Sequence, residues 1–304
     1  MSLILFPEFS SASRNGLERP LNSFTVGITF KNSEGISDLC SGALISPTFI
    51  VTAAHCVSDT NKQIYTEFVF TAPATKLDAP LNSATQPKIL KTYIPDGYFT
   101  DSTSENNDIA FIQLDRKISN SGYIRPATLN EVAQIPNDAD LNGYGFGAVF
   151  ETGEQYSTVA REYGLIWSSK DSQVKQTIEL TSKNSVGCSG DSGGPITTKS
   201  QSGEEILIAT LHSAAFVENR CGTPAPDGLF YMQVSLIAKF LPLVDAELVK
   251  SLAVSSPSPK PSRYVKPKIY KITCLKVKTK KYVSGTAPKC PAGYKQIAKI
   301  LISK

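Results

Sequence analysis

Three short strings in the sequence carry side chains that can do chemistry together. Ser192 lies in the glycine-rich string CSGDSGGP at 188–195. His55, one of two histidines, ends the apolar run VTAAHC, and Asp108 precedes the apolar run IAFIQL. A serine hydroxyl is a weak nucleophile that needs a base, and an imidazole oriented by a carboxylate can be that base. The three strings therefore predict nucleophilic catalysis by Ser192.

Each string taken alone also has a structural interpretation. A glycine-rich turn can contain Ser192 without chemistry, His55 can pack at the end of a strand, and Asp108 can cap a turn. The glycines beside Ser192, however, let the backbone turn tightly and direct N–H groups at a developing negative charge. Acyl transfer needs such donors, so the catalytic interpretation is favoured.

Together, TAAHC, NDIAFIQL and GDSGGP resemble the trypsin and chymotrypsin family of serine peptidases, in a bacterial secreted form. The strings follow that family's order of His, Asp and Ser, separated by 53 and 84 residues, and the resemblance covers about 13–248. It implies that His55 takes the Ser192 proton while Asp108 orients the imidazole. It also implies an oxyanion hole formed by the N–H groups of Gly190 and Ser192.

The six cysteines contain no C-x-x-C pair, which weakens a zinc site, and we expect no metal or other cofactor. Their even number favours disulfides in an oxidising compartment, although sequence alone allows fifteen connectivities. The expected pairs are Cys40–Cys56 and Cys188–Cys221, which match family disulfides, and Cys274–Cys290.

The resemblance also suggests a substrate pocket. In the family, the residue six before the nucleophile lies at the base of the pocket for the P1 residue, which precedes the cleaved bond. Here it is Val186, which offers no carboxylate to a Lys or Arg side chain, so we expect a small or medium apolar P1 residue unless Asp227 reaches in. His212 aligns with a pocket wall where bacterial glutamyl endopeptidases carry a histidine that meets an acidic P1 residue; a histidine that packs in its strand is the favoured alternative. The other expected pocket residues are Ser189, Ser213 and Ala215.

One departure from the family pattern concerns activation. Family members are activated by cleavage before an Ile-Val-Gly-Gly-like start, whose new amine pairs with the residue that is Asp191 here. The matching stretch at 13–16 is SRNG, which lacks the hydrophobic start. The alternative function is therefore a weak or inactive homologue that acts as a binding module, tethered by its basic tail.

Short β-branched and aromatic runs broken by turn residues predict an all-β protein. The runs lie at 24–30, 43–52, 67–71, 109–114, 172–180 and 205–211. The family resemblance implies two six-stranded antiparallel β-barrels packed together, with a C-terminal helix. Helical spacing over 234–252, interrupted by Pro242, predicts that helix, and GYGFG at 143–147 is interpreted as a turn or bulge.

The domain organisation follows from composition. We expect a leader or propeptide remnant at 1–12, a peptidase domain at 13–252, a proline-rich linker at 253–267 and a small disulfide-stapled β unit at 268–304. Residues 250–304 carry 14 Lys and Arg and no Asp or Glu, whereas the rest carries 17 Lys and Arg against all 27 acids.

Such a basic segment, residues 256–304, favours a polyanionic partner such as envelope material, although a solvated spacer is the alternative. The expected partners are otherwise protein or peptide substrates of a monomer. The cysteines favour a secreted or envelope-associated protein, while 1–12 lacks the basic start of a signal peptide. No stretch is apolar for long enough to suggest a membrane span.

Overall fold

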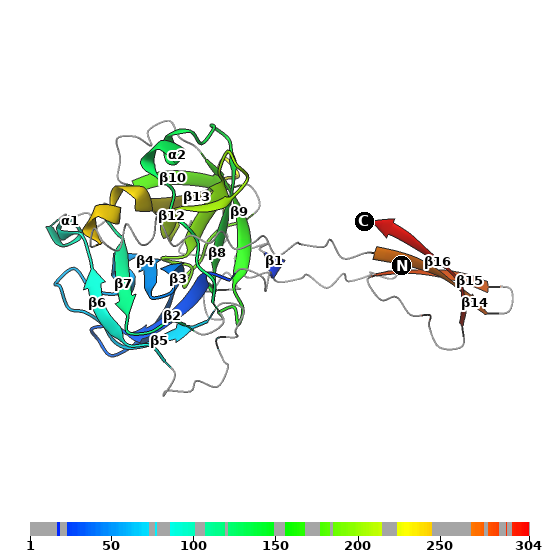
Figure 1. Cartoon of the computed structure of the whole chain (residues 1–304), viewed down its shortest axis with the longest axis horizontal. Helices are drawn as coiled ribbons and strands as arrows, with labels where there is room; N and C mark the ends of the chain where they lie inside the picture. The colour runs from blue at the N-terminus through cyan, green and yellow to red at the C-terminus, as the bar shows by residue number, and fades with distance from the viewer. Residues whose placement is uncertain are drawn as a thin grey trace. The chain divides into compact units, whose positions relative to one another are not determined.

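Antiparallel β-strands make up most of the regular structure, as the short apolar runs predict (Figure 1). The computed structural model describes residues 17–18, 23–72, 77, 86–100, 107–118, 121–148, 156–167, 177–182, 185–214, 224–244, 269–276, 279–285, 290 and 294–303. The chain divides into two compact units, residues 1–256 and 257–304. Each unit is described by itself.

The first barrel is a six-stranded antiparallel sheet in the order β5-β2-β3-β4-β7-β6. Its strands are β2 (Thr25–Lys31), β3 (Ser37–Ser46), β4 (Phe49–Thr52), β5 (Thr66–Thr71), β6 (Ile89–Tyr93) and β7 (Ala110–Leu114). Two short helices interrupt the sequence of strands, a 3-10 turn η1 (Ala54–Cys56) after β4 and helix α1 (Asp96–Thr100) after β6.

The second barrel follows in the order β9-β10-β13-β12-β11-β8, and a further pairing of β8 with β9 closes it. Its strands are β8 (Asp140–Gly145), β9 (Arg161–Trp167), β10 (Thr177–Ser182), β11 (Pro195–Lys199), β12 (Glu205–Ala214) and β13 (Phe230–Leu236). The two-residue strand β1 (Leu17–Glu18) adds to β9, and helix α2 (Leu129–Ala133) precedes β8. The expected fold of two six-stranded antiparallel barrels is confirmed.

Strands β4 and β7 alternate between two cores. Ile50 and Ile112 point into the first barrel, whereas Val51 and Phe111 belong to a second buried cluster. The second barrel and the segment after it contribute Tyr144, Leu207, Ile237 and Phe240 to that second cluster. Each such buried side chain contributes about 1.5–3 kcal/mol. Both faces of these strands are covered, which explains why their sequences read as continuous apolar runs.

Three local predictions are wrong in detail. The run at 43–52 is two strands, because Pro47 lies in the turn between β3 and β4 and has no N–H for a strand ladder. The predicted helix over 234–252 begins instead as the last three residues of β13. Two 3-10 turns follow, η3 (Ile237–Lys239) and η4 (Leu241–Leu243), with Pro242 in the second; 245–252 lie outside the described residues.

The string GYGFG at 143–147 is not a simple turn, since its first three residues belong to β8. A Cβ at Gly143 would lie 2.2 Å from the ring of Tyr163, and one at Gly147 would lie 2.2 Å from the Asp191 carboxylate. These glycines are therefore present because other groups approach the backbone closely.

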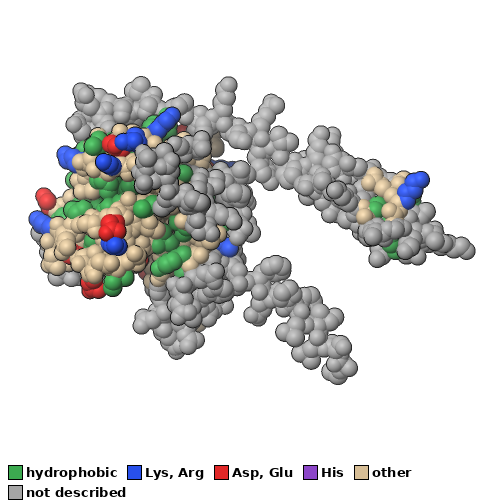
Figure 2. Space-filling view, turned by 90° about the horizontal axis from the view of Figure 1, so that it is seen from below, with side chains coloured by type: hydrophobic (Ala, Val, Ile, Leu, Met, Phe, Trp, Pro, Cys, Tyr) green, Lys and Arg blue, Asp and Glu red, His purple; other side chains and the backbone are tan. Residues whose placement is uncertain are grey.

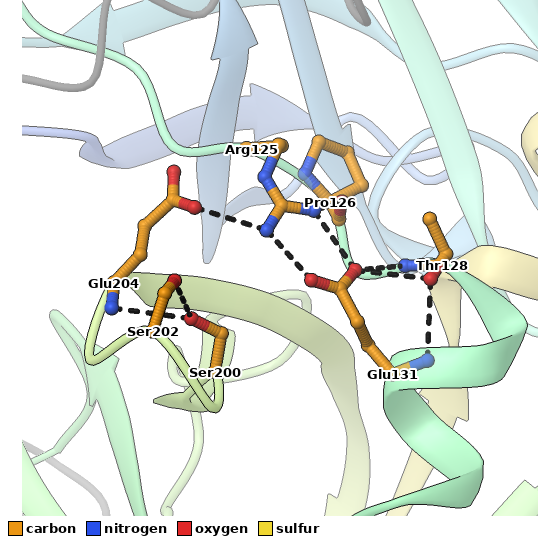
Figure 3. Close-up of polar contacts among 7 residues, drawn as sticks. All are labelled: Arg125, Pro126, Thr128, Glu131, Ser200, Ser202 and Glu204. Atoms are coloured by element: carbon orange, nitrogen blue, oxygen red, sulfur yellow. Dashed lines mark hydrogen bonds and ion pairs between the residues drawn. The ribbon is translucent and has the colours of Figure 1, made fainter.

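A partly buried ion pair ties the segment between the barrels to helix α2 (Figure 3). Arg125 Nη1 and Nη2 donate to the two oxygens of Glu131 at 2.9 and 2.8 Å, and Nη2 also donates to Glu204 at 3.0 Å. Thr128 caps α2, because its hydroxyl accepts from the Glu131 N–H while Glu131 accepts from the Thr128 N–H. Glu131 thus both caps α2 and joins it to Arg125.

The second unit contains a three-stranded antiparallel sheet in the order β15-β14-β16. Its strands are β14 (Ile269–Lys276), β15 (Thr279–Gly285) and β16 (Lys295–Ser303). Cys290 is disulfide-bonded, but the side chain of its expected partner Cys274 lies outside the described set.

On the face drawn in Figure 2, Lys, Arg, Asp and Glu side chains of the first unit are scattered among hydrophobic side chains and other groups. Within the described residues, no helix is long and apolar enough to cross a membrane.

Candidate active site

His55 is placed by the end of strand β4 and a disulfide. It lies in η1, which follows β4 directly, and the neighbouring Cys56 is bonded to Cys40 on β3. The backbone N–H of His55 donates to Asp108 Oδ1 at 2.9 Å, which fixes the main chain at this point. The imidazole therefore projects from a rigid corner of the first barrel.

Asp108 lies two residues before β7, the strand paired with β4, so the pairing brings it beside His55. Its Oδ2 lies 2.7 Å from His55 Nδ1, and its side chain is 1% exposed against 38% for His55. The Asp108 carbonyl accepts from the Ser235 hydroxyl at 2.9 Å. A buried carboxylate on Nδ1 holds the imidazole with its other nitrogen available as an acceptor.

The two groups shift each other's pKa. Burial disfavours the charged imidazolium, but the charge and hydrogen bond of Asp108 outweigh it and raise the pKa of His55. Burial likewise opposes the carboxylate, but the charge and hydrogen bond of His55, together with His212, lower the pKa of Asp108. Asp108 is therefore an anion at neutral pH, suited to stabilise a protonated His55.

Ser192 is held from both barrels. The next residue, Gly193, has a φ of +76° and donates its N–H to the Leu211 carbonyl at 2.7 Å. A Cβ at Gly193 would lie 2.0 Å from Thr52 Oγ1, so only glycine fits there. The Ser192 carbonyl accepts from the Ser41 N–H of the first barrel at 2.8 Å.

The peptide between Ser189 and Gly190 faces in a defined direction. The Ser189 carbonyl accepts from the Ala148 N–H at 2.8 Å, and the Gly190 carbonyl accepts from Ser41 Oγ at 2.8 Å. Because N–H and C=O point opposite ways across a trans peptide, the Gly190 N–H points away from Ala148. Gly190 has a φ of +90°, which a residue with a side chain rarely adopts. Among the described residues, the N–H groups of Gly190 and Ser192 have no hydrogen-bond acceptor.

Asp191 is fully buried beneath this loop. Its two carboxylate oxygens accept from the N–H groups of Gly147 and Cys188, at 2.7 and 2.8 Å. The stretch 13–16, expected to supply an activating amine, lies outside the described residues.

A cavity of about 530 Å³ brings these groups together. His55, Asp108 and Ser192 all line it, although no hydrogen bond between Ser192 Oγ and the His55 ring is present among the described contacts. Such bonds are often long in an enzyme without substrate. The other lining residues are Asp59, Thr60, Tyr65, Tyr98, Gly187, Cys188, Ser189, Leu211, His212, Ser213 and Ala214.

The expected pocket residues are only partly at the cavity. Ser189, His212 and Ser213 line it, but Val186 is fully buried in the core of the second barrel and is not a lining residue. Asp227 is likewise no lining residue; its carboxylate bonds the Leu229 N–H and the Tyr231 hydroxyl. Ala215 and Cys221 lie outside the described residues.

His212 has a contact that sequence reasoning did not anticipate. Its Nε2 lies 3.3 Å from Asp108 Oδ2, and its ring centroid is 6.2 Å from that of His55. One carboxylate oxygen thus faces two imidazoles. The only signal in the sequence is that the second histidine follows an apolar strand.

The cysteines were expected to be disulfide-bonded and not to bind metal. Cys40–Cys56 is formed, and Cys188 is disulfide-bonded, with its expected partner Cys221 not described. The one cluster of potential metal ligands in the described part of the chain is Cys40, His55 and Cys56. Both of its sulfurs are in the disulfide, so they cannot act as thiolate ligands.

Comparison with known proteins agrees with this geometry. The trypsin family model matches residues 13–241. The chain belongs to the trypsin family. Its expected fold and its expected class, serine endopeptidase, are confirmed by that membership.

Similar proteins include serine protease SP24D of Anopheles gambiae, 27% identical over 64% of this chain and 68% of that protein. Human granzyme M is 28% identical over 53% of this chain and 64% of its own length. Chymotrypsin-like elastase family member 1 of Rattus norvegicus is 27% identical, with coverages of 63% and 75%. These relatives are animal proteins, so the bacterial secreted form remains a prediction.

Proposed function

We propose that this trypsin-family protein hydrolyses peptide bonds through an acyl-enzyme on Ser192, with His55 as general base and Asp108 as its orienting carboxylate. The observation that carries the proposal is the 2.7 Å contact of His55 Nδ1 with a buried Asp108, in a cavity that Ser192 also lines. His55 accepts the Ser192 proton as the hydroxyl attacks the carbonyl carbon, then donates it to the leaving amine. Water repeats the two steps to release the acid.

The Gly190 and Ser192 N–H groups are proposed to stabilise the oxyanion of each tetrahedral intermediate. Two observations support this role: the Ser189 carbonyl is turned towards Ala148, and both N–H groups are without acceptors among the described residues. Donors already oriented at a developing charge need no reorganisation during the reaction, and losing one typically costs about 100- to 1,000-fold in rate.

Labelling with a fluorophosphonate probe tests the proposal. Wild type should be labelled stoichiometrically and Ser192→Ala should not. The rate should rise as pH increases through the pKa of His55, because only neutral imidazole can accept the proton. The Asp108 contact raises that pKa, so the rise should be centred above the ordinary value of about 6.5. Absence of labelling in folded wild type would favour the inactive binding homologue instead.

The proposed P1 preference is small or medium apolar, and not Lys or Arg. Leu211 on the cavity wall supports it, and Val186, at the expected pocket base, carries no carboxylate that could pair with a P1 cation. An acidic P1 residue is a second candidate, because His212 lines the cavity. Cleavage of matched peptides with Ala, Leu, Glu and Lys at P1 discriminates the two; equal rates would contradict both.

For the rest of the molecule, we propose a secreted or envelope-associated protein with a peptidase domain at 13–252, a linker at 253–267 and a basic module at 268–304. The charge distribution supports binding of polyanionic envelope material, since the 14 Lys and Arg from residue 250 onward meet no acidic residue in that segment.

A further inference from the structure

Tyr163, on strand β9, carries a buried hydroxyl that the proposed mechanism does not use. The residue is 1% exposed, and its Oη has no hydrogen-bond partner among the described residues. Buried polar groups are nearly always hydrogen-bonded, because a buried unsatisfied hydroxyl destabilises the protein. A buried hydroxyl without a partner therefore suggests that a ligand supplies one.

The hydroxyl lies directly behind the cavity wall. A Cβ built on Gly187 would be 3.3 Å from Tyr163 Oη and 2.6 Å from Leu211 Cδ2. Gly187 and Leu211 both line the cavity that contains Ser192. Gly187 has no side chain to cover the phenol, so Tyr163 Oη lies behind the part of the wall that Gly187 and Leu211 form.

The charges near Tyr163 Oη determine which kind of P1 side chain could bind there. Burial and the Asp191 charge raise the pKa of Tyr163 well above its ordinary value, so the phenol keeps its proton. A P1 carboxylate here would be repelled by the buried Asp191. A P1 ammonium would lose its hydration without a free carboxylate, because Asp191 already accepts from Gly147 and Cys188. A neutral polar group avoids both costs.

We propose that Tyr163 Oη is a specificity-determining group at the closed end of the P1 pocket, and that it selects a P1 side chain with a neutral polar tip, such as glutamine. The inference rests on the proposed peptidase function and changes its P1 preference from an apolar side chain to one with an apolar stem and a neutral polar tip. An amide oxygen would accept from the phenol while the methylene groups contact Leu211. Methionine has a similar length and shape but a much weaker acceptor, which makes it the matched comparison.

Peptide substrates that differ only in Gln or Met at P1 test the proposal on the full-length protein. Wild type should prefer Gln, and Tyr163→Phe should lower kcat/KM for the Gln peptide about tenfold while leaving the Met peptide within twofold. Because the hydroxyl is unsatisfied without substrate, Tyr163→Phe should also leave the melting temperature unchanged or raise it. The proposal is overturned if Tyr163→Phe lowers kcat/KM equally for both peptides, leaves the Gln to Met ratio of kcat/KM unchanged, or lowers the melting temperature.

Tyr144→Phe is the matched control. The Tyr144 hydroxyl is also in the second barrel, but it donates to Glu205 at 3.0 Å and is not at the cavity. Its removal should lower the melting temperature without changing the Gln to Met ratio. Wild type that cleaves no peptide and takes no fluorophosphonate label overturns the peptidase function together with this inference. Active wild type with an unchanged ratio in Tyr163→Phe overturns the inference alone.

Discussion

The Asp108 carboxylate is shared more widely than the His, Asp and Ser strings suggest. Oδ1 accepts from the His55 backbone, while Oδ2 faces both His55 Nδ1 at 2.7 Å and His212 Nε2 at 3.3 Å. The charge of His212 lowers the pKa of Asp108, so His212 acts on the same carboxylate that stabilises protonated His55. The basicity of His55 therefore depends on a residue that need not touch substrate.

Replacing His212 with alanine should raise the pKa of His55, since Asp108 would then interact with one imidazole only. The acid limb of the pH profile of kcat/KM should therefore move to higher pH. Assays with one apolar P1 peptide between pH 5 and 9 measure the shift. Ser213→Ala, the neighbouring change on the same cavity wall, should leave the limb in place. A limb that stays fixed in His212→Ala would contradict the coupling.

At the scale of elements, Glu131 links helix α2 to the segment between the barrels. The hydrogen bond from Arg125 is the largest cause that lowers the pKa of Glu131, from 4.5 to about 2, followed by opposing burial and by bonds from Thr128. A group with a lowered folded-state pKa stabilises the protein fully above its unfolded-state pKa and loses that contribution as pH falls. The relevant window is therefore from about pH 5 down to 2.

Glu131→Gln keeps a side chain that can cap α2 but removes the charge. In a Ser192→Ala background, which prevents self-cleavage, it should lower the free energy of unfolding at pH 7 by about 1–2 kcal/mol. The difference should shrink towards pH 2, where wild-type Glu131 is protonated too. Urea unfolding at pH 7 and 3 measures both. Glu67→Gln, which breaks the exposed pair of Glu67 with Lys31, should have almost no effect; an equal loss there would contradict the argument.

Sequence patterns located most strands because the information lies within a few residues. The runs at 109–114 and 205–211 match β7 and β12 within a few residues, since β-branched side chains favour a pleated, covered surface. Features that depend on contacts between residues far apart in the sequence could not be predicted from local patterns. Gly143 is glycine because Tyr163 packs on it from β9.

The same distinction applies to the site. His55, Asp108 and Ser192 could be located because each is embedded in a distinctive string. Val186 was assigned to the pocket from its distance along the chain from Ser192, but it packs into the core. Tyr163 carries no local signal at all, because only the pairing of β8 with β9 and the bare Gly187 bring its hydroxyl near the cavity.

For the whole molecule, all described residues of the cavity belong to the unit of residues 1–256. A chain ending at 256 should therefore keep kcat/KM for a short peptide within about twofold, since a compact unit with its own core can fold alone. It should lose binding to a heparin column that the full chain shows at low salt and releases at high salt. Retention on heparin that does not depend on salt would contradict polyanion binding by the basic segment. Loss of peptide hydrolysis on truncation would contradict the assignment of catalysis to residues 1–256.

Ser41 is fully buried on β3, where its N–H bonds the Ser192 carbonyl and its hydroxyl bonds the Gly190 carbonyl. During synthesis, the first barrel emerges from the ribosome carrying the base and the carboxylate but no nucleophile. Ser235 on β13, which bonds the Asp108 carbonyl, emerges more than forty residues after Ser192. The candidate site is therefore complete only after β13, the last strand of the second barrel, has been synthesised.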